Sequence, residues 1–377
     1  MSLSQQRRRS RGFTLIEMMV SIAVLGVVSI YLTDMLIRQS RTYAVVDQVT
    51  EVQQNLRAIA DLLEREARAT GFMVPEASSF CGIDNTNGSD IVFFTDGDAI
   101  NPLNQVSLNL GVPITGGYVG TGTDVLNLAG PIGNPTTTDD VPFYDNDNDG
   151  VADSDFLANN ALGLFGGVIV VDRGNPGLGA ACGLVRAAGA NSITVDFTMR
   201  VGPGPTALVP APDPIAAGVG ADLVAIPAHW YAVVPPAASG ATSPQLWRDN
   251  LVLADDVEDL QFAAFFDVDG DGLVTGNVAA ALEPARSATE YPGSANPGVQ
   301  YAGDDWDHSQ LRELRINFVV RTRNQDADAL ANPAARVGSF ETTENRAPPG
   351  GPADGFRRRV HTITVKPRNL GLRPLES

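Results

Sequence analysis

The feature that most constrains this chain of 377 residues is an abrupt change in polarity near its amino end. A basic segment, Arg7–Arg11, ends at Gly12, and a long apolar run, Phe13–Ile37, begins at once. One carboxylate, Glu17, lies at the fifth position of this run. A charged side chain near the middle of a bilayer costs about 3 kcal/mol on insertion scales, so it normally has a partner and a function. The run therefore predicts a membrane-spanning helix with a functional acid.

Two simpler explanations of this segment stay open. A secretory signal peptide has a short apolar core and a small-residue cleavage site, but here no Ala-x-Ala site ends the run. An ordinary signal anchor explains the basic segment by the positive-inside rule and the run by its length, but gives no reason for Glu17. A second acid, Asp34, indicates either the edge of the bilayer or a place where the helix loosens on assembly.

The basic leader followed by Gly12, Phe13 and Glu17 resembles the type IV prepilin signature. The resemblance implies that prepilin peptidase cuts between Gly12 and Phe13, and that the new amine of Phe13 is methylated. It also implies that Glu17 meets the terminal amine of a neighbouring subunit during assembly. The chain would then be a filament subunit rather than a secreted globular protein.

One long helix is expected from Phe13 to Thr70, because this segment contains no proline and only one glycine, Gly26. Thr70-Gly71, followed by Pro75, predicts its end. Past the membrane run, apolar residues recur every three or four positions, which gives a narrow apolar stripe. Such a stripe is also typical of a coiled coil or an ordinary core helix; beside the prepilin-like junction it resembles the spine helix of pilins. The stripe comprises Val45, Val49, Val52, Leu56, Ile59 and Leu63.

Residues 72–377 consist of short β-rich runs between clusters of glycine, proline, asparagine and aspartate. They contain no second long helical pattern, which argues against βαβ repeats and a nucleotide-binding sheet. We therefore expect an α+β fold, with a long N-terminal helix packed on a mainly antiparallel β-sheet body with long loops. The candidate strands are Ile91–Thr95, Val168–Asp172, Ile193–Thr198, His229–Val234, Leu260–Phe266, Leu314–Thr322 and His361–Val365.

Late segments of the chain resemble minor pilins of the PilW type. They are Val257–Phe262 with the acidic turn Asp267–Gly272, then Leu311–Arg321, then Phe356–Val360 through Leu370. This resemblance covers the N-terminal helix and much of residues 250–370. Residues 80–250 resemble no family, and this region is a candidate for an insertion. The expected segments are a leader of residues 1–12, a transmembrane and spine helix of residues 13–71, and a periplasmic or extracellular body of residues 72–377.

The net charge is −18, and removal of the basic leader would make it more negative. Such a charge repels phosphate backbones, so direct nucleic-acid binding through a general basic surface is not expected.

Cys81 and Cys182 are the only cysteines. A body outside the cytoplasmic membrane lies in an oxidising compartment, which favours a disulfide. Two unpaired buried thiols are the alternative, since the sequence does not give the distance between them.

Two acidic loops contain alternating aspartates near a glycine, which supply the hard oxygen ligands that Ca²⁺ prefers. An EF-hand has a glutamate at its twelfth position, where this chain has Phe156 and Val278, so each loop is at most a partial site. The alternative is exposed Asp-Gly turns between strands. The candidate ligands are Asp145, Asp147, Asp149, Asp153 and Asp155 in one loop and, more weakly, Asp267, Asp269 and Asp271 in the other.

No enzyme is expected, because the chain has no Gly-x-Ser-x-Gly elbow and its acid–histidine cluster, Asp304–His308, is typical of a solvated loop.

We expect a minor pilin that acts in assembly initiation or at the tip of a type IV pilus. Its partners would be other minor and major pilins, prepilin peptidase and the inner-membrane assembly platform. It would lie in the inner membrane before assembly and on the cell surface afterwards. The alternatives are a J-type pseudopilin of a type II secretion system and a pilus-displayed adhesin or ligand-binding module.

Overall fold

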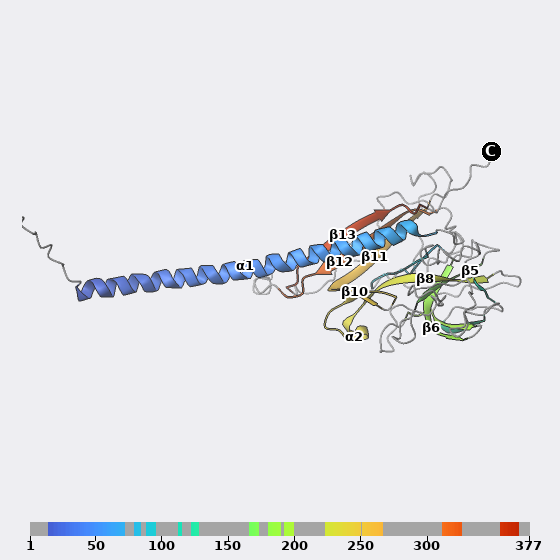
Figure 1. Cartoon of the computed structure of the whole chain (residues 1–377), viewed down its shortest axis with the longest axis horizontal. Coiled ribbons are helices and arrows are strands. Elements are labelled where there is room, and N and C mark those ends of the chain that lie inside the picture. The colour runs from blue at the N-terminus through green and yellow to red at the C-terminus, as the bar shows by residue number, and fades with distance from the viewer. Residues whose placement is uncertain are drawn as a thin grey trace, which may run out of the picture. The chain divides into compact units, whose positions relative to one another are not determined.

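A computed structural model describes twelve stretches of the chain. It shows a long N-terminal helix whose C-terminal part packs against antiparallel β-sheets, which confirms the expected α+β class (Figure 1). The chain divides into two compact units, one of residues 1–51 and one of residues 52–377. The described residues are 14–71, 79–83, 88–95, 112–114, 122–127, 166–172, 180–189, 192–199, 223–249, 251–266, 311–325 and 355–368.

Two helices and thirteen strands make up the regular structure of the described residues. The long helix is α1 (Leu15–Ala69), and α2 (Pro236–Ser239) is a single turn. The strands are β1 (Phe80–Ile83), β2 (Ile91–Phe94), β3 (Val112–Pro113), β4 (Thr123–Asn127), β5 (Gly167–Asp172), β6 (Ala180–Gly189), β7 (Ser192–Asp196), β8 (Leu223–Val234), β9 (Gln245–Arg248), β10 (Leu251–Asp255), β11 (Val257–Phe266), β12 (Leu311–Arg321) and β13 (Arg358–Val365).

Helix α1 ends where the sequence predicts. The amide of Thr70 still donates to the carbonyl of Glu66 at 3.0 Å, while Gly71 turns out of the helix with a φ of 80°. Glycine adopts this left-handed conformation without a Cβ penalty, which is why it commonly follows a helix. The Gly71 amide then donates to the carbonyl of Thr95 at 2.9 Å. The end of α1 is therefore bonded directly to the segment that follows β2.

The larger sheet has ten antiparallel strands and is organised around β8. The second half of β8 pairs with β2 and β9, and its first half pairs with β5 and β3. From β5 the sheet continues through β6 and β7 to β4, and from β9 it continues to β10. All seven strands expected from the sequence are present; β8 begins six residues earlier than expected, and the bounds of the others differ by three residues or fewer.

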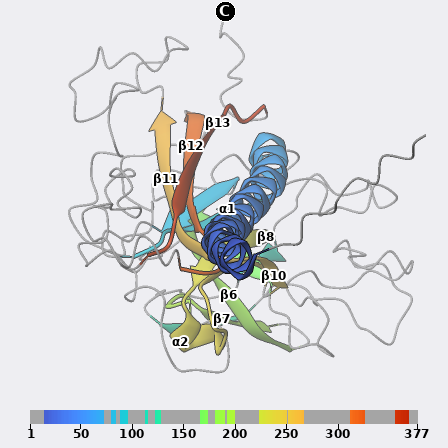
Figure 2. The ribbon, with the colours of Figure 1, turned by 90° about the vertical axis from the view of Figure 1, so that its left-hand side faces the viewer.

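The smaller sheet has the order β11–β12–β13, with Leu260 opposite Phe318 and Phe318 opposite His361. Figures 1 and 2 both show β6 well apart from these three strands. The two sheets are joined by Ser89 and Asp90, which bond to the outer edge of β11. The Asp90 amide donates to the carbonyl of Leu260 at 2.8 Å, and Asp90 Oδ2 accepts from the amide of Phe262 at 3.0 Å.

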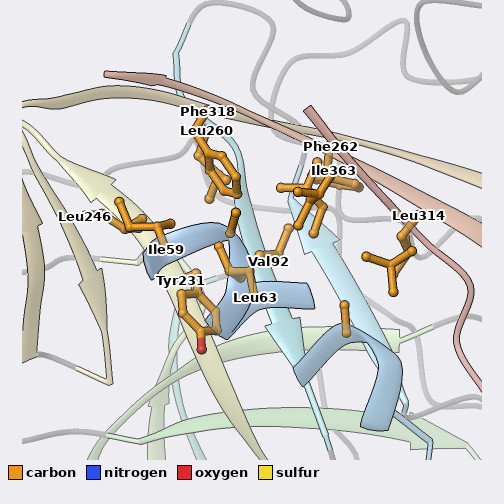
Figure 3. Close-up of a cluster of buried hydrophobic side chains, with 14 of the residues drawn as sticks. Ile59, Leu63, Val92, Tyr231, Leu246, Leu260, Phe262, Leu314, Phe318 and Ile363 are labelled. Carbon is orange, nitrogen blue, oxygen red and sulfur yellow. The ribbon is translucent and has the colours of Figure 1, made fainter. Parts of the chain in front are cut away.

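The main core lies where the C-terminal part of α1 meets both sheets. The expected stripe continues into the body as Val52, Leu56, Ile59 and Leu63, all of which are buried. Figure 3 shows Ile59 and Leu63 pointing into a cluster of side chains from strands of both sheets. At about 25 cal/mol per Å² of buried apolar surface, such a cluster supplies the main stabilisation of the body. The labelled strand residues are Val92, Tyr231, Leu246, Leu260, Phe262, Leu314, Phe318 and Ile363.

Glycine is required at one close contact between the sheets. A Cβ atom on Gly82 in β1 would lie 2.2 Å from the ring of Phe262 in β11. The same ring packs edge-on against Phe80, with the ring centroids 5.6 Å apart. Any larger residue at position 82 would displace Phe262 from the core that the two sheets share.

Candidate functional site

The first turn of α1 contains Glu17, the acid that the sequence singles out. The amide and the hydroxyl of Thr14 both donate to Glu17 Oε2, at 2.9 and 3.0 Å. The Glu17 amide donates in return to Thr14 Oγ1 at 3.3 Å. This reciprocal arrangement is a capping box, which satisfies amides that the helix itself leaves unpaired. Gly12 and Phe13, the predicted cleavage site, lie outside the described residues.

The first part of α1 presents a long, mostly apolar surface from Leu15 to Ile37, in which Glu17 and Asp34 are the charged residues. Every residue from Thr14 to Ala44 is exposed, including Leu15 at 79 % and Ile30 at 71 %. Among the described residues, α1 is the one helix that is long and apolar enough to cross a membrane. Soluble proteins rarely expose so large an apolar surface, so it indicates contact with lipid or with other protein.

The second acid of the apolar run is paired within the helix. Asp34 Oδ2 lies 3.0 Å from Arg38 Nε, one turn further along α1. Pairs at this spacing stabilise an exposed helix by about 0.3–0.5 kcal/mol. Helix α1 continues unbroken past Asp34 in the single chain, and loosening on assembly stays a prediction.

A buried acid joins the last turns of α1 to the larger sheet. Glu66 is only 4 % exposed and accepts a hydrogen bond from the hydroxyl of Tyr231 in β8. Its other oxygen, Oε1, lies 2.8 Å from the guanidinium of Arg248 in β9. Burial raises the pKa of Glu66, and the positive charge of Arg248 opposes this shift. Three elements of the body therefore meet at one carboxylate.

The same polar cluster includes a histidine–aspartate pair. His229 Nδ1 in β8 lies 2.5 Å from Asp249 Oδ2, just after β9. Asp249 has a φ of 47°, and its other oxygen accepts from the amide of Trp230 at 3.1 Å. Burial alone would lower the pKa of His229, but the charge of Asp249 and its hydrogen bond raise this pKa to about 9. The imidazole is therefore protonated at neutral pH and forms an ion pair.

We expect the free energy of unfolding to fall as the pH rises from about 6.5 to about 9. The pKa of His229 is higher in the folded protein than in the unfolded chain. Its contribution to the free energy of unfolding is therefore complete below the unfolded-state pKa, and it is lost as the pH rises through the folded-state pKa. Urea unfolding of the detergent-purified protein at several pH values measures this slope. The variant His229→Gln should flatten it, whereas the control His361→Gln should not. An equal slope in all three proteins would contradict the assignment.

The two cysteines are joined in the structure. Cys81 in β1 and Cys182 in β6 are both fully buried, their sulfur atoms are 2.04 Å apart, and their Cα atoms are 6.2 Å apart. The bond spans 101 positions of the sequence. It links β1 to β6, two strands of the larger sheet that are separated by β2, β8 and β5 in the strand order.

The acidic loops cannot be placed in the same way, because all their candidate ligands lie outside the described residues. Within the described stretches, no group of three or more histidine, cysteine, aspartate or glutamate side chains is placed to bind a metal ion. Calcium binding therefore stays a prediction from the sequence. The residues concerned are Asp145, Asp147, Asp149, Asp153 and Asp155, and Asp267, Asp269 and Asp271.

The cluster around Glu66 was missed by the sequence analysis, although a signal for it exists. Glu66 follows Leu63 by three positions, so it continues the apolar stripe that Leu56, Ile59 and Leu63 define. An acid on the buried stripe of a helix needs a cation or a donor in the sheet that it faces. Nothing in the sequence identifies Tyr231 and Arg248 as those partners.

Comparison with known proteins agrees with the geometry of the N-terminal segment. Residues 7–33 match the family described as the prokaryotic N-terminal methylation motif. No curated protein and no solved structure matches the chain. The matched residues include Glu17 and the first part of the exposed apolar helix. The chain therefore carries, at its prepilin-like junction, the N-terminal methylation motif that type IV pilins and pseudopilins share.

Proposed function

We propose that the chain is a minor pilin of the PilW type, which acts in assembly initiation or at the tip of a type IV pilus. The observation that carries this proposal is the methylation motif at residues 7–33, continuous with a fully exposed apolar helix. The proposed segments are the leader, residues 1–12, the spine helix, residues 13–71, and the body, residues 72–377. A body of this size suits a tip or priming subunit better than one that repeats along the shaft.

The capping box supports a role for Glu17 in assembly. Both bonds from Thr14 go to Oε2, so Oε1 accepts no hydrogen bond within the described residues. Cleavage before Phe13 would create a positive amine next to Thr14. An amine and a carboxylate in lipid are each costly alone, and pairing between subunits offsets that cost. Glu17 would therefore draw the helix into register with the Phe13 amine of its neighbour.

The exposed apolar surface of α1 suits two successive environments of the helix, first the membrane and then the filament. Before assembly the helix would hold the subunit in the inner membrane, with the body in the periplasm. During assembly the platform would move the helix out of lipid, and the helices of other pilins would cover the same apolar residues. The net charge of −18 supports protein partners rather than nucleic acid.

Mass spectrometry of the protein from its native host tests the first step of this proposal. The expected amino terminus is an N-methylated Phe13, and an uncut chain or a cut elsewhere would contradict the pilin role. A deletion strain then separates the related functions. Loss of twitching motility is expected for a pilus subunit. Loss of exoprotein release with normal twitching would instead indicate a J-type pseudopilin, and loss of surface attachment alone would indicate an adhesin.

A further inference from the structure

One edge of the smaller sheet is open. Within the described residues, β13 pairs with β12 and with no other strand. In an antiparallel sheet, every second residue of an edge strand directs its N–H and C=O away from its neighbour. Beside this edge Val360 is 39 % exposed, and Thr362 and Thr364 are exposed on the same face. Within the described residues, no strand therefore occupies this edge of β13.

At the opposite edge of the same sheet, side chains of the segment that precedes β2 bond to the backbone of β11. Ser89 Oγ accepts from the amide of Leu260 at 2.8 Å, and Asp90 Oδ2 accepts from the amide of Phe262. These side chains occupy the bonding positions of β11 that another strand would otherwise use. Natural sheets usually protect their edges against unwanted pairing. Within the described residues, side chains that occupy backbone hydrogen-bonding positions are found at the β11 edge of this sheet and not at the β13 edge.

The open edge is also basic, in a chain whose net charge is −18. Residues 356–368 contain no acid. Arg359, Lys366 and Arg368 are exposed and form no ion pair among the described residues. Arg358 is held by Glu258, so the sheet itself neutralises one cation of this stretch. The three exposed cations would favour an incoming segment of negative charge.

We propose that the β13 edge binds an extended, acidic segment of a neighbouring pilin-type subunit, which adds a strand to the β11–β12–β13 sheet. Main-chain hydrogen bonds would provide the affinity, and the cations at both ends of β13 would select the charge of the segment. The proposal rests on the proposed function, because it names the chemistry of a filament partner. Among the other edge strands of the described residues, β10 presents Leu251, Val252 and Leu253, which offer no comparable charge selection.

Site-specific photocrosslinking in the native host tests this proposal on the full chain. A benzophenone amino acid replaces Thr364 on β13 or, as the control, Val125 on the edge strand β4, which is 60 % exposed. Sheared filaments are irradiated, and the crosslinked peptides are identified by mass spectrometry. The expected result is a crosslink from position 364 to an acidic segment of a subunit with a methylation motif. No such crosslink is expected from position 125.

Charge reversal sharpens this test. The triple variant Arg359→Glu, Lys366→Glu and Arg368→Glu should reduce the crosslink by about tenfold or more, equivalent to about 1.4 kcal/mol. The matched control Arg57→Glu with Arg65→Glu reverses two exposed arginines of α1 and should retain it. An unchanged melting temperature shows that each variant is folded.

The outcomes separate this inference from the proposed function. If the subunit is cleaved and present in filaments, but position 364 crosslinks to lipid, to a basic segment or to nothing, the edge inference is wrong and the pilin role stands. A crosslink that survives the triple charge reversal also overturns the inference. Absence of the cleaved subunit from filaments contradicts the proposed function, and the inference fails with it.

Discussion

The variant Glu17→Ala is expected to be cleaved after Gly12 normally but to be strongly depleted from filaments. Removing one partner of a buried charge pair costs about 3 kcal/mol or more, which corresponds to roughly a hundredfold loss of incorporation. Cleavage should be unaffected, because Glu17 belongs to the first turn of a helix that begins after the cut site. Immunoblots of sheared filaments and of membranes, with mass spectrometry of the amino terminus, measure both effects.

Two further variants show whether the loss of Glu17→Ala from filaments results from its missing charge or from its missing helix cap. Glu17→Gln keeps an oxygen that accepts from Thr14 but removes the negative charge, so we expect it to be nearly as defective as Glu17→Ala. Asp47→Ala removes an exposed acid further along α1 and should assemble normally. Normal piliation with Glu17→Ala would refute the charge-pair role. Full rescue by Glu17→Gln would assign Glu17 to capping alone.

The double variant Cys81→Ala and Cys182→Ala is expected to lower the free energy of unfolding by about 2–5 kcal/mol. The bond closes a loop of 101 positions, so its removal releases much conformational freedom in the unfolded chain. Both residues are fully buried, and their substitution by alanine leaves little other change at the surface. Urea unfolding of the purified protein, compared with the unaltered chain, gives the difference.

Reduction provides the matched control for the disulfide. Dithiothreitol should destabilise the unaltered protein by a similar amount and leave the double variant unchanged. Alkylation of the unreduced, denatured protein should modify neither cysteine. Alkylation of both thiols in protein from the native host, or equal stability of the two chains, would contradict this prediction.

The long helix and seven strands could be read from the sequence because their signals are local. Absence of proline between Phe13 and Thr70, and Gly71 after it, define α1 to within two residues. In β12, the apolar residues Leu314, Ile316, Phe318 and Val320 recur at every second position, as is typical of a strand. By contrast, β6 was missed because Ala180–Gly189 is rich in alanine and glycine, which have low strand propensity. Pairing with β5 and β7 on both sides overrides that preference.

The candidate site likewise contains local features that the sequence predicts and long-range contacts that it does not. Glu17 was identified because an acid in an apolar run is costly within a bilayer and because it lies shortly after Gly12 and Phe13. Its capping bond to Thr14 is also local, spanning only three positions. The ion pairs of Glu66 with Arg248 and of His229 with Asp249 link residues far apart or on separate strands. Such partners depend on strand register, which no local pattern in this chain defines.

The sequence by itself therefore determined the long apolar helix, the N-terminal methylation motif and the β-rich nature of the body, since each follows from polarity and spacing along the chain. Only the tertiary structure decided that β8 is central, that Cys81 meets Cys182 and that, among the described strands, β13 pairs on one side only. These features depend on which strands become neighbours. That choice is made by the burial of apolar surface summed over the whole core, to which every element contributes at once.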